Sequence, residues 1–180
     1  ADHDDELEPQ ALYECVRAIN AHPDVQVLYS DEDKVDFEDI YYFEPHFKTD
    51  FNPDLLRSVN YICHLFVARR SLLDAIAETD ADGRKIYERS AYDGAQDYDL
   101  ILRATEKAQA MESSLNALDQ ELLRQGRFTS SNIIHIPMVL YHWRAHQAST
   151  AQHPEAKLYA FEAGARAVYD PVSYTHLTLP

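Results

Sequence analysis

Glycine and cysteine are both scarce in this sequence, which has four glycines and two cysteines in 180 residues. The chain contains neither GxxxxGK[ST] nor GxGxxG, so the common glycine-rich phosphate-binding loops are excluded. Cys15 and Cys63 lack a CxxC partner and lie in apolar stretches, so we expect buried free thiols in a reducing compartment. No apolar run approaches the roughly 18 residues of a membrane span, and no signal-peptide pattern is present.

Basic residues are also few: 16 Lys and Arg stand against 31 Asp and Glu, for a net charge of -15. This charge disfavours nucleic acid and anionic membrane surfaces as partners, and an anionic substrate would require a bridging metal ion. The apolar content of 46% and the aromatic content of 11% are those of a folded globular chain, and the length suits one domain.

Helical and strand patterns alternate along the chain, which predicts an α/β fold. The first predicted helix begins near Pro9, with Asp5 or Glu6 close to its start, and presents apolar residues at helical spacing. Pro137 places its own strand at an edge or a bend. The predicted strands are 25–30, 39–43, 61–68 and 132–143, and the later predicted helices are 52–60, 69–77, 97–125 and 154–170.

Three polar clusters, "DHDDE", "SDEDK" and "DGAQDYD", fall where predicted strands end or helices begin. In open α/β sheets such ends converge on a ligand crevice. An EF-hand calcium loop is excluded, because the glycine it needs at its sixth position is Leu7 when counted from Asp2 and Asp36 when counted from Asp31. The opening acids therefore have two interpretations, a solvated helix terminus or a site for a hard divalent cation.

Four ordered motifs carry a resemblance: "DHDDELEPQALYE", "VLYSDEDKVD", "DGAQDYDLILR" and "IPMVLYHWRAHQAST". Over about residues 1–168 the chain resembles family 2 glycosyltransferases of the GT-A fold, and bacterial members that build surface polysaccharides in particular. The resemblance implies a Rossmann-like mixed sheet flanked by helices. It also implies transfer of a sugar from a nucleotide-diphosphate sugar to a glycan acceptor, by a single inverting displacement. The implied location is cytoplasmic, including the inner face of the membrane where the parent protein is membrane-associated.

The resemblance assigns metal binding to the first motif. Asp2 and Asp4 match the family's DxD element, which holds Mg²⁺ or Mn²⁺ against the donor diphosphate, and Asp5 lies beside them. A cation there can neutralise the charge that develops on the leaving diphosphate. His142 matches a third metal ligand of some members, and its alternative is an ordinary polar residue at a strand end.

The resemblance assigns the general base to Asp97, which would take the proton of the acceptor hydroxyl. Gln96 stands where the family usually has an acid, so it is open how the pKa of the base is adjusted. The alternative for Asp97 is a simple helix cap. Asp99 is a candidate for an indirect or acceptor contact.

The remaining candidates come from the last motif and from "SDEDK". Arg144, His146 and Trp143 are candidates for the donor diphosphate or the substrate, against an ordinary ion pair or core packing. Asp31 and Asp33 would lie on the acceptor side or near the metal, or else in a solvated turn.

The chain departs from the family in three places. It starts at the DxD element, so the nucleotide-binding units of a GT-A domain are missing. We therefore expect residues 1–170 to be the C-terminal half of a catalytic domain, with little activity alone. Residues 109–131 read as a helical insertion. The tail 171–180 does not continue the amphipathic pattern and resembles an artefact.

Two rival functions remain open. A degenerate glycosyltransferase-like module that binds glycan or protein is suggested by Gln96. A metal-dependent phosphoesterase would also need clustered acids, but that class normally has more histidine ligands near them than His3 supplies.

Overall fold

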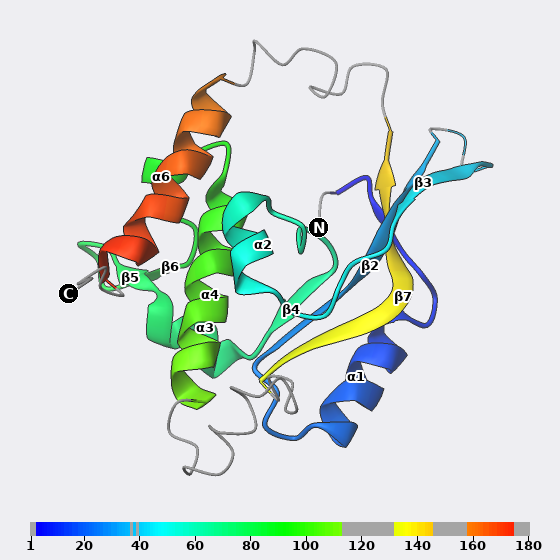
Figure 1. Cartoon of the computed structure of the whole chain (residues 1–180), viewed down its shortest axis with the longest axis horizontal. Helices are drawn as coiled ribbons and strands as arrows, with labels where there is room; N and C mark the ends of the chain where they lie inside the picture. Colours follow the sequence, from blue (N-terminus) through cyan, green and yellow to red (C-terminus); the bar gives the residue numbers. More distant parts are fainter. Residues whose placement is uncertain (1–2, 37, 39, 113–131, 146–157, 175–180) are drawn as a thin grey trace.

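The computed structural model describes residues 3–36, 38, 40–112, 132–145 and 158–174. Its centre is a mixed five-stranded sheet of order β1-β7-β2-β3, with β4 also paired to β2 (Figure 1). Helices flank the sheet, so the α/β prediction is confirmed. The strands of this sheet are β1 (Glu6–Leu7), β2 (Val27–Val35), β3 (Tyr42–His46), β4 (Phe66–Ala68) and β7 (Ile133–Arg144).

The parallel pair β2–β7 forms the spine of the sheet, and the other pairs in it are antiparallel. Its register runs from Val27 opposite Ile133 to Val35 opposite Arg144. The register shifts next to Ser30, whose partner is Ile136, and the two residues that follow Ile136 are passed over. Pro137 is one of them, so it lies at an irregularity of the strand pairing, in line with the edge or bend expected for a residue that cannot donate to the sheet.

Side chains alternate between the two faces of β2 and enter two separate cores. Val27 and Tyr29 belong to the larger core, which packs against four helices, whereas Leu28 faces a smaller core under α1 (Ala11–Ala21). Figure 1 shows α1 apart from the other helices, which lie across the sheet from it. These four are α2 (Pro53–Ser58), α3 (Arg70–Ile76), α4 (Gln96–Glu112) and α6 (Leu158–Tyr174).

Residues 61–65 do not form the strand predicted over 61–68, since only Phe66–Ala68 pairs with β2. The buried ammonium group of Lys48 donates hydrogen bonds to the backbone carbonyl of Ile62, at 2.7 Å, and to that of His64. Those carbonyls are therefore not available to a neighbouring strand. The apolar pattern still marked buried side chains correctly, because Ile62 is fully inside the larger core.

The start of the first helix was also predicted wrongly. Helix α1 begins at Ala11 with Gln10 at its N-cap, and Glu6 lies in the short strand β1 instead of at the helix start. The acids of this segment are held by β7. Of the apolar residues that recur at helical spacing in α1, Cys15 is buried but Leu12 is 70% exposed.

The remaining segments complete the helical side of the molecule. A two-stranded sheet, β5 (Glu78–Thr79) and β6 (Lys85–Ile86), and a short 3-10 helix, η1 (Ser90–Tyr92), connect α3 to α4. The predicted insertion 109–131 lies mostly outside the described residues. Helix α6 runs to Tyr174, four residues into the tail that begins at 171. Among the described helices, none has the length and apolarity to cross a membrane.

We expect the Leu72→Ala substitution to lower the free energy of unfolding by about 2–5 kcal/mol, because it leaves a cavity in the larger core. Leu72 is 2% exposed on α3. Leu12→Ala is the matched control on an exposed helical surface and should cost less than about 0.5 kcal/mol. Urea unfolding followed by circular dichroism measures both, and equal losses would contradict the assignment of the core.

Candidate active site

Arg144, at the end of β7, clamps the acidic N-terminal segment. Its Nε donates to the main-chain oxygen of Asp4 at 2.6 Å, and one terminal nitrogen contacts the Glu6 carboxylate at 2.5 Å. Its backbone N–H donates to the Asp5 carboxylate at 2.9 Å. The guanidinium that sequence resemblance suggested for a diphosphate is therefore engaged by the protein itself.

Tyr141 connects this segment to the interior of the site. Its hydroxyl donates to the Asp5 carboxylate, and its ring is 1% exposed and stacked on the His64 ring at 4.5 Å between centroids. Since β1 pairs with β7 in this region, with Leu7 opposite Tyr141, the contact is set by strand register. Tyr141 also lines a cavity of about 630 Å³.

Asp97 lies in the first turn of α4 and is exposed. Its carboxylate accepts a hydrogen bond of 3.1 Å from the Asn60 side-chain amide. Gln96 accepts a bond of 2.8 Å from the backbone N–H of Gly94, so its side chain stabilises the turn that precedes the helix. This turn needs glycine, because Gly94 has φ of +90° and a Cβ there would lie 2.5 Å from Tyr159.

Two cavities meet at Asp97. The cavity of about 630 Å³ is lined by Asp97 and by side chains that include Cys63, His64, Gln96 and Tyr141. A second one, of about 590 Å³, lies towards α6 and has Asn60, Phe161 and Tyr169 in its lining. Asp97 therefore faces a space large enough for a small ligand on either side.

Tyr141 connects the acidic N-terminal segment to the cavity that Asp97 lines, and none of the described N-terminal acids lines that cavity itself. Asp5 contacts Tyr141 directly, and Tyr141 shares its cavity with Asp97. The Asp4 side chain is 26% exposed, and its carboxylate lies 3.8 Å from the His3 ring. Asp2 and His146 lie outside the described residues.

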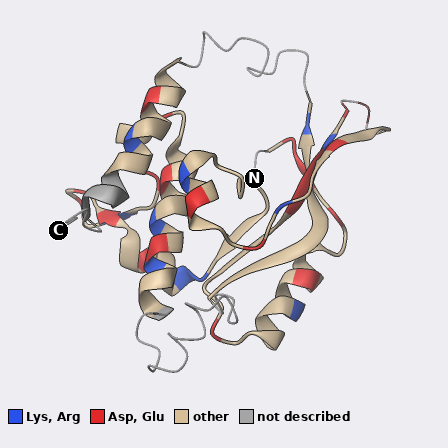
Figure 2. Ribbon diagram, viewed as in Figure 1, with Lys and Arg blue, Asp and Glu red and all other residues tan. Residues whose placement is uncertain are grey.

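The "SDEDK" acids, which sequence reasoning could not assign, continue β2 and do not form a turn after it (Figure 2). Asp31 is buried and accepts hydrogen bonds of 2.8 Å from the backbone N–H of Lys48 and from the His135 ring. Asp33 lies 2.5 Å from Nδ1 of His142. These acids serve in internal contacts between strands.

His142 is enclosed by carboxylates on both sides of its ring. It is 4% exposed, with Nδ1 at Asp33 and Nε2 3.3 Å from the Glu8 carboxylate. The Tyr42 ring packs against it at 4.7 Å between centroids. Its ring therefore joins β7 to β2, to β3 and to the segment after β1.

Glu32 is the centre of a charged group that sequence reasoning missed. Its carboxylate lies 3.7 Å from the Lys48 ammonium and 3.3 Å from the ring of His64. Burial opposes ionisation of Glu32, but the hydrogen bond of His64 and the charge of Lys48 outweigh it and lower the pKa of the carboxyl group. Burial lowers the pKa of Lys48, and Glu32 opposes that shift. The alternation of the strand was the available signal, because it puts Glu32 on the opposite face from its neighbours.

The neighbours of His64 favour the protonated form of its imidazole. Burial disfavours the charge, but hydrogen bonds and charges from Cys63 and Glu32 outweigh burial and raise the pKa of His64 to about 10. Cys63 Sγ lies 3.3 Å from Nδ1 of the ring. The expectation of two buried thiols holds for Cys15, whereas Cys63 is partly exposed.

Two further candidates have internal partners. Asp99 is 1% exposed and is paired with Arg103 at 2.9 Å and with Arg89, so it joins α4 to the segment before η1. Trp143 is partly exposed, and the ammonium of Lys34 lies 5.2 Å from its ring centroid. Neither residue lines the two cavities beside Asp97.

No protein-family model matches the chain. It is 38% identical over 174 residues to the uncharacterized protein y4gI of Sinorhizobium fredii, an alignment that covers 97% of this chain and 16% of that protein. It is 34% identical over 165 residues to the O-antigen biosynthesis protein RfbC of Myxococcus xanthus, with coverage of 92% and 10%. The chain is homologous to both over nearly its whole length. It spans about a sixth or less of the length of these relatives.

We expect Arg144→Met to destabilise the chain by about 1–3 kcal/mol, because the acceptors of a largely buried guanidinium lose their donor. Amide hydrogen exchange should rise first in residues 4–8, which β7 holds through this side chain. Arg166→Met is the matched control, since Arg166 is exposed and donates to the Ala91 carbonyl at 3.0 Å. Unchanged protection of residues 4–8 would show that the clamp does not hold the segment.

Proposed function

We propose that the chain is the acceptor-side half of a GT-A glycosyltransferase domain in a longer protein. It would transfer a sugar from a nucleotide-diphosphate sugar to a glycan acceptor, in the biosynthesis of a bacterial surface polysaccharide of the O-antigen type. The observation that carries the proposal is Tyr141, which binds Asp5 and lines the same cavity as Asp97. A candidate base for the acceptor therefore borders a cavity whose wall includes the tyrosine that binds an N-terminal acid, an arrangement that suits transfer between two bound substrates.

The homology supports a role in O-antigen biosynthesis and a place within a longer protein. One relative is named an O-antigen biosynthesis protein, and both relatives are far longer than this chain. The surface of α1 also supports a larger domain, because Leu12, Val16 and Ile19 are 70%, 54% and 39% exposed. Apolar side chains gathered on one helix face are typical of a surface that another segment covers. Nucleotide-binding units of the longer protein would supply that cover.

Asp97 would act as the general base for the acceptor hydroxyl. It is exposed and lines two cavities, and the amide of Asn60 orients its carboxylate without neutralising it. A carboxylate held in this way can accept a proton as the hydroxyl attacks the anomeric carbon. The exposed rings of Phe161 and Tyr169, 67% and 75% exposed, would provide flat surfaces for the acceptor sugar.

The N-terminal acids suit a hard divalent cation. Carboxylate oxygens are the ligands that Mg²⁺ and Mn²⁺ prefer, and Arg144 holds Asp4 by its main-chain oxygen. Asp2 and Asp4 would hold the ion, which supplies charge neutralisation for the leaving diphosphate. His142 would join them only after its ring gave up Glu8 or Asp33. We therefore assign His142 first to positioning the segment after β1.

The test is Asp97→Asn in the full-length protein that carries these residues. We expect sugar transfer to fall roughly 10²–10⁴-fold, since the amide cannot take the proton. Asp93→Asn is the matched control, because Asp93 is exposed and lies just before the same helix. Release of nucleotide diphosphate together with analysis of the glycan product measures the reaction.

Wild-type transfer by the Asp97→Asn protein would refute the assignment of the base. Retained glycan binding without any transfer by the wild-type protein would support a binding module instead, the reading to which Gln96 points. Hydrolysis of phosphate esters without glycan product would favour a phosphoesterase.

Removal of divalent metal by a chelator should abolish transfer, and Mg²⁺ or Mn²⁺ should restore it. Asp4→Asn should raise the concentration of metal needed for half-maximal activity, because one anionic ligand is lost. Asp24→Asn, at an exposed site before β2, should leave that concentration unchanged. Full activity in excess chelator would rule out the metal-dependent mechanism.

A further inference from the structure

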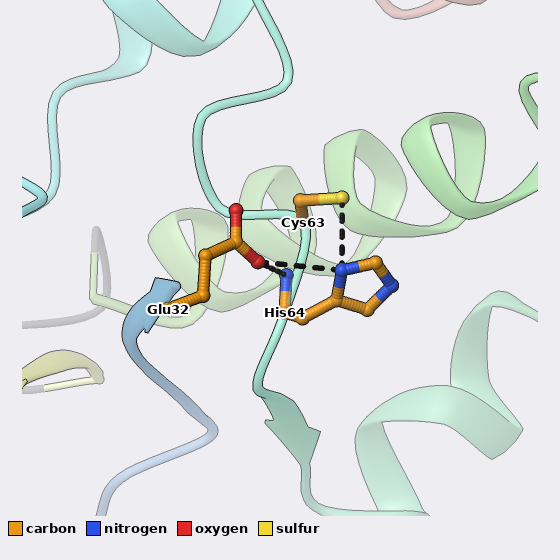
Figure 3. A group of neighbouring side chains, drawn as sticks. All are labelled: Glu32, Cys63 and His64. Atoms are coloured by element: carbon orange, nitrogen blue, oxygen red, sulfur yellow. Dashed lines mark hydrogen bonds and ion pairs between the residues drawn. The ribbon is translucent and has the colours of Figure 1, made fainter. Parts of the chain in front are cut away.

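Three side chains with different donor atoms converge beside the cavity of about 630 Å³. Figure 3 shows Glu32 from β2 pointing towards Cys63 and His64, which lie in the segment between α2 and β4. The Cys63 sulfur and the Glu32 Oε2 are each 3.3 Å from Nδ1 of His64. One ligand atom from each residue lies within 4.8 Å of the other two.

The two separations of 3.3 Å to Nδ1 match those of ligands around one metal ion. In a tetrahedral zinc site, with bonds of about 2.0–2.3 Å, neighbouring ligand atoms lie about 3.3–3.6 Å apart. The donor set is one sulfur, one nitrogen and one oxygen. A thiolate among the ligands favours a borderline or soft cation such as Zn²⁺ over Mg²⁺.

A nucleophilic cysteine is the main alternative use of this group, and the geometry disfavours it. In a Cys–His–acid arrangement the thiol and the acid bind opposite nitrogens of the imidazole ring. Here Cys63 and Glu32 approach the same nitrogen, Nδ1. Convergence on a single point is what a shared central ion would produce.

The surroundings would hold such a site rigid and leave one side open. The ring of His64 is stacked on Tyr141 with an interplanar angle of 6°, and its backbone N–H donates to Glu32 Oε2 at 3.2 Å. Cys63 and His64 both line the cavity that Asp97 lines. Three protein ligands beside an accessible space are the pattern of a zinc site with a free coordination position.

The ammonium of Lys48 is the positive charge that lies next to the three proposed ligands. This ammonium is 3.7 Å from Glu32 Oε2 and also donates to the carbonyls of Ile62 and His64. Binding of the ion would release the proton from Nδ1 of His64 and the proton of the Cys63 thiol, because only the deprotonated groups are ligands. The thiolate of Cys63 and the carboxylate of Glu32 would then balance a divalent ion, while Lys48 competes with it for the carboxylate. Glu32 should therefore be the weakest of the three ligands.

We propose that Glu32, Cys63 and His64 form a binding site for Zn²⁺ or a similar divalent transition metal, with one open position facing the cavity that Asp97 lines. The site is separate from the N-terminal acids, and the proposal stands whether or not the chain takes part in sugar transfer.

Co²⁺ titration of the chelator-treated 180-residue chain tests the proposal. We expect a thiolate-to-cobalt charge-transfer band in the near ultraviolet, visible bands of a four-coordinate ion, and loss of both on addition of Zn²⁺. Cys63→Ser should abolish the charge-transfer band, whereas Cys15→Ser, at a cysteine 5% exposed in the smaller core, should leave it intact. His64→Gln should weaken Co²⁺ binding at least about tenfold, and Glu32→Gln should weaken it less. No band in the wild-type chain, or a band that survives Cys63→Ser, would overturn the proposal.

Protection from alkylation gives a second test that needs no variant. Zn²⁺ should slow the reaction of Cys63 with iodoacetamide, measured by mass spectrometry, and Mg²⁺ at the same concentration should not. Equal rates with and without Zn²⁺, in a chain whose circular dichroism is unchanged, would equally overturn the site.

Discussion

Three consecutive acids in an interior strand, Asp31 to Asp33, impose the constraint on which much of this structure depends. A carboxylate taken out of water needs a hydrogen-bonded or charged partner, because the loss of hydration costs several kcal/mol per ion. Alternation along β2 sends Glu32 to the opposite face from Asp31 and Asp33, so the three acids draw their partners from several parts of the chain. The partners come from β7 and from the segments on either side of α2, namely His135, Lys48, His64 and His142.

The candidate site follows from the same pairings. His64 is brought to β2 by Glu32, and it stacks on Tyr141, which in turn binds Asp5. Arg144 fixes the N-terminal acids three residues further along β7 than Tyr141. The cavity that Asp97 lines is therefore walled by side chains that hold the sheet together. Chemistry at this site would depend on packing as much as on the acids themselves.

Sequence patterns predicted which helices and strands form better than they predicted where each one begins and ends. Strand β7 and helix α3 lie where apolar periodicity put them, and Pro137 falls at the expected bend. The strand predicted over 61–68 was wrong in its first half, because periodicity reports burial, and Ile62 is buried without being paired in the sheet. The prediction of a helix start near Pro9 was also wrong, because the local pattern does not show tertiary partners. The preceding acids are bound by Arg144, which lies far along the chain.

Local patterns along this chain were enough to establish an α/β fold, the acidic character, and the places where polar clusters gather. They could also mark Asp97 at a helix start, since capping and periodicity act between near neighbours. The pairing of acids with their partners required the folded sheet. Glu32 and His64 are 32 residues apart, and Asp5 and Tyr141 are 136 apart, so no local rule connects them. Strand register brings these groups within bonding distance, and register depends on the packing of whole faces.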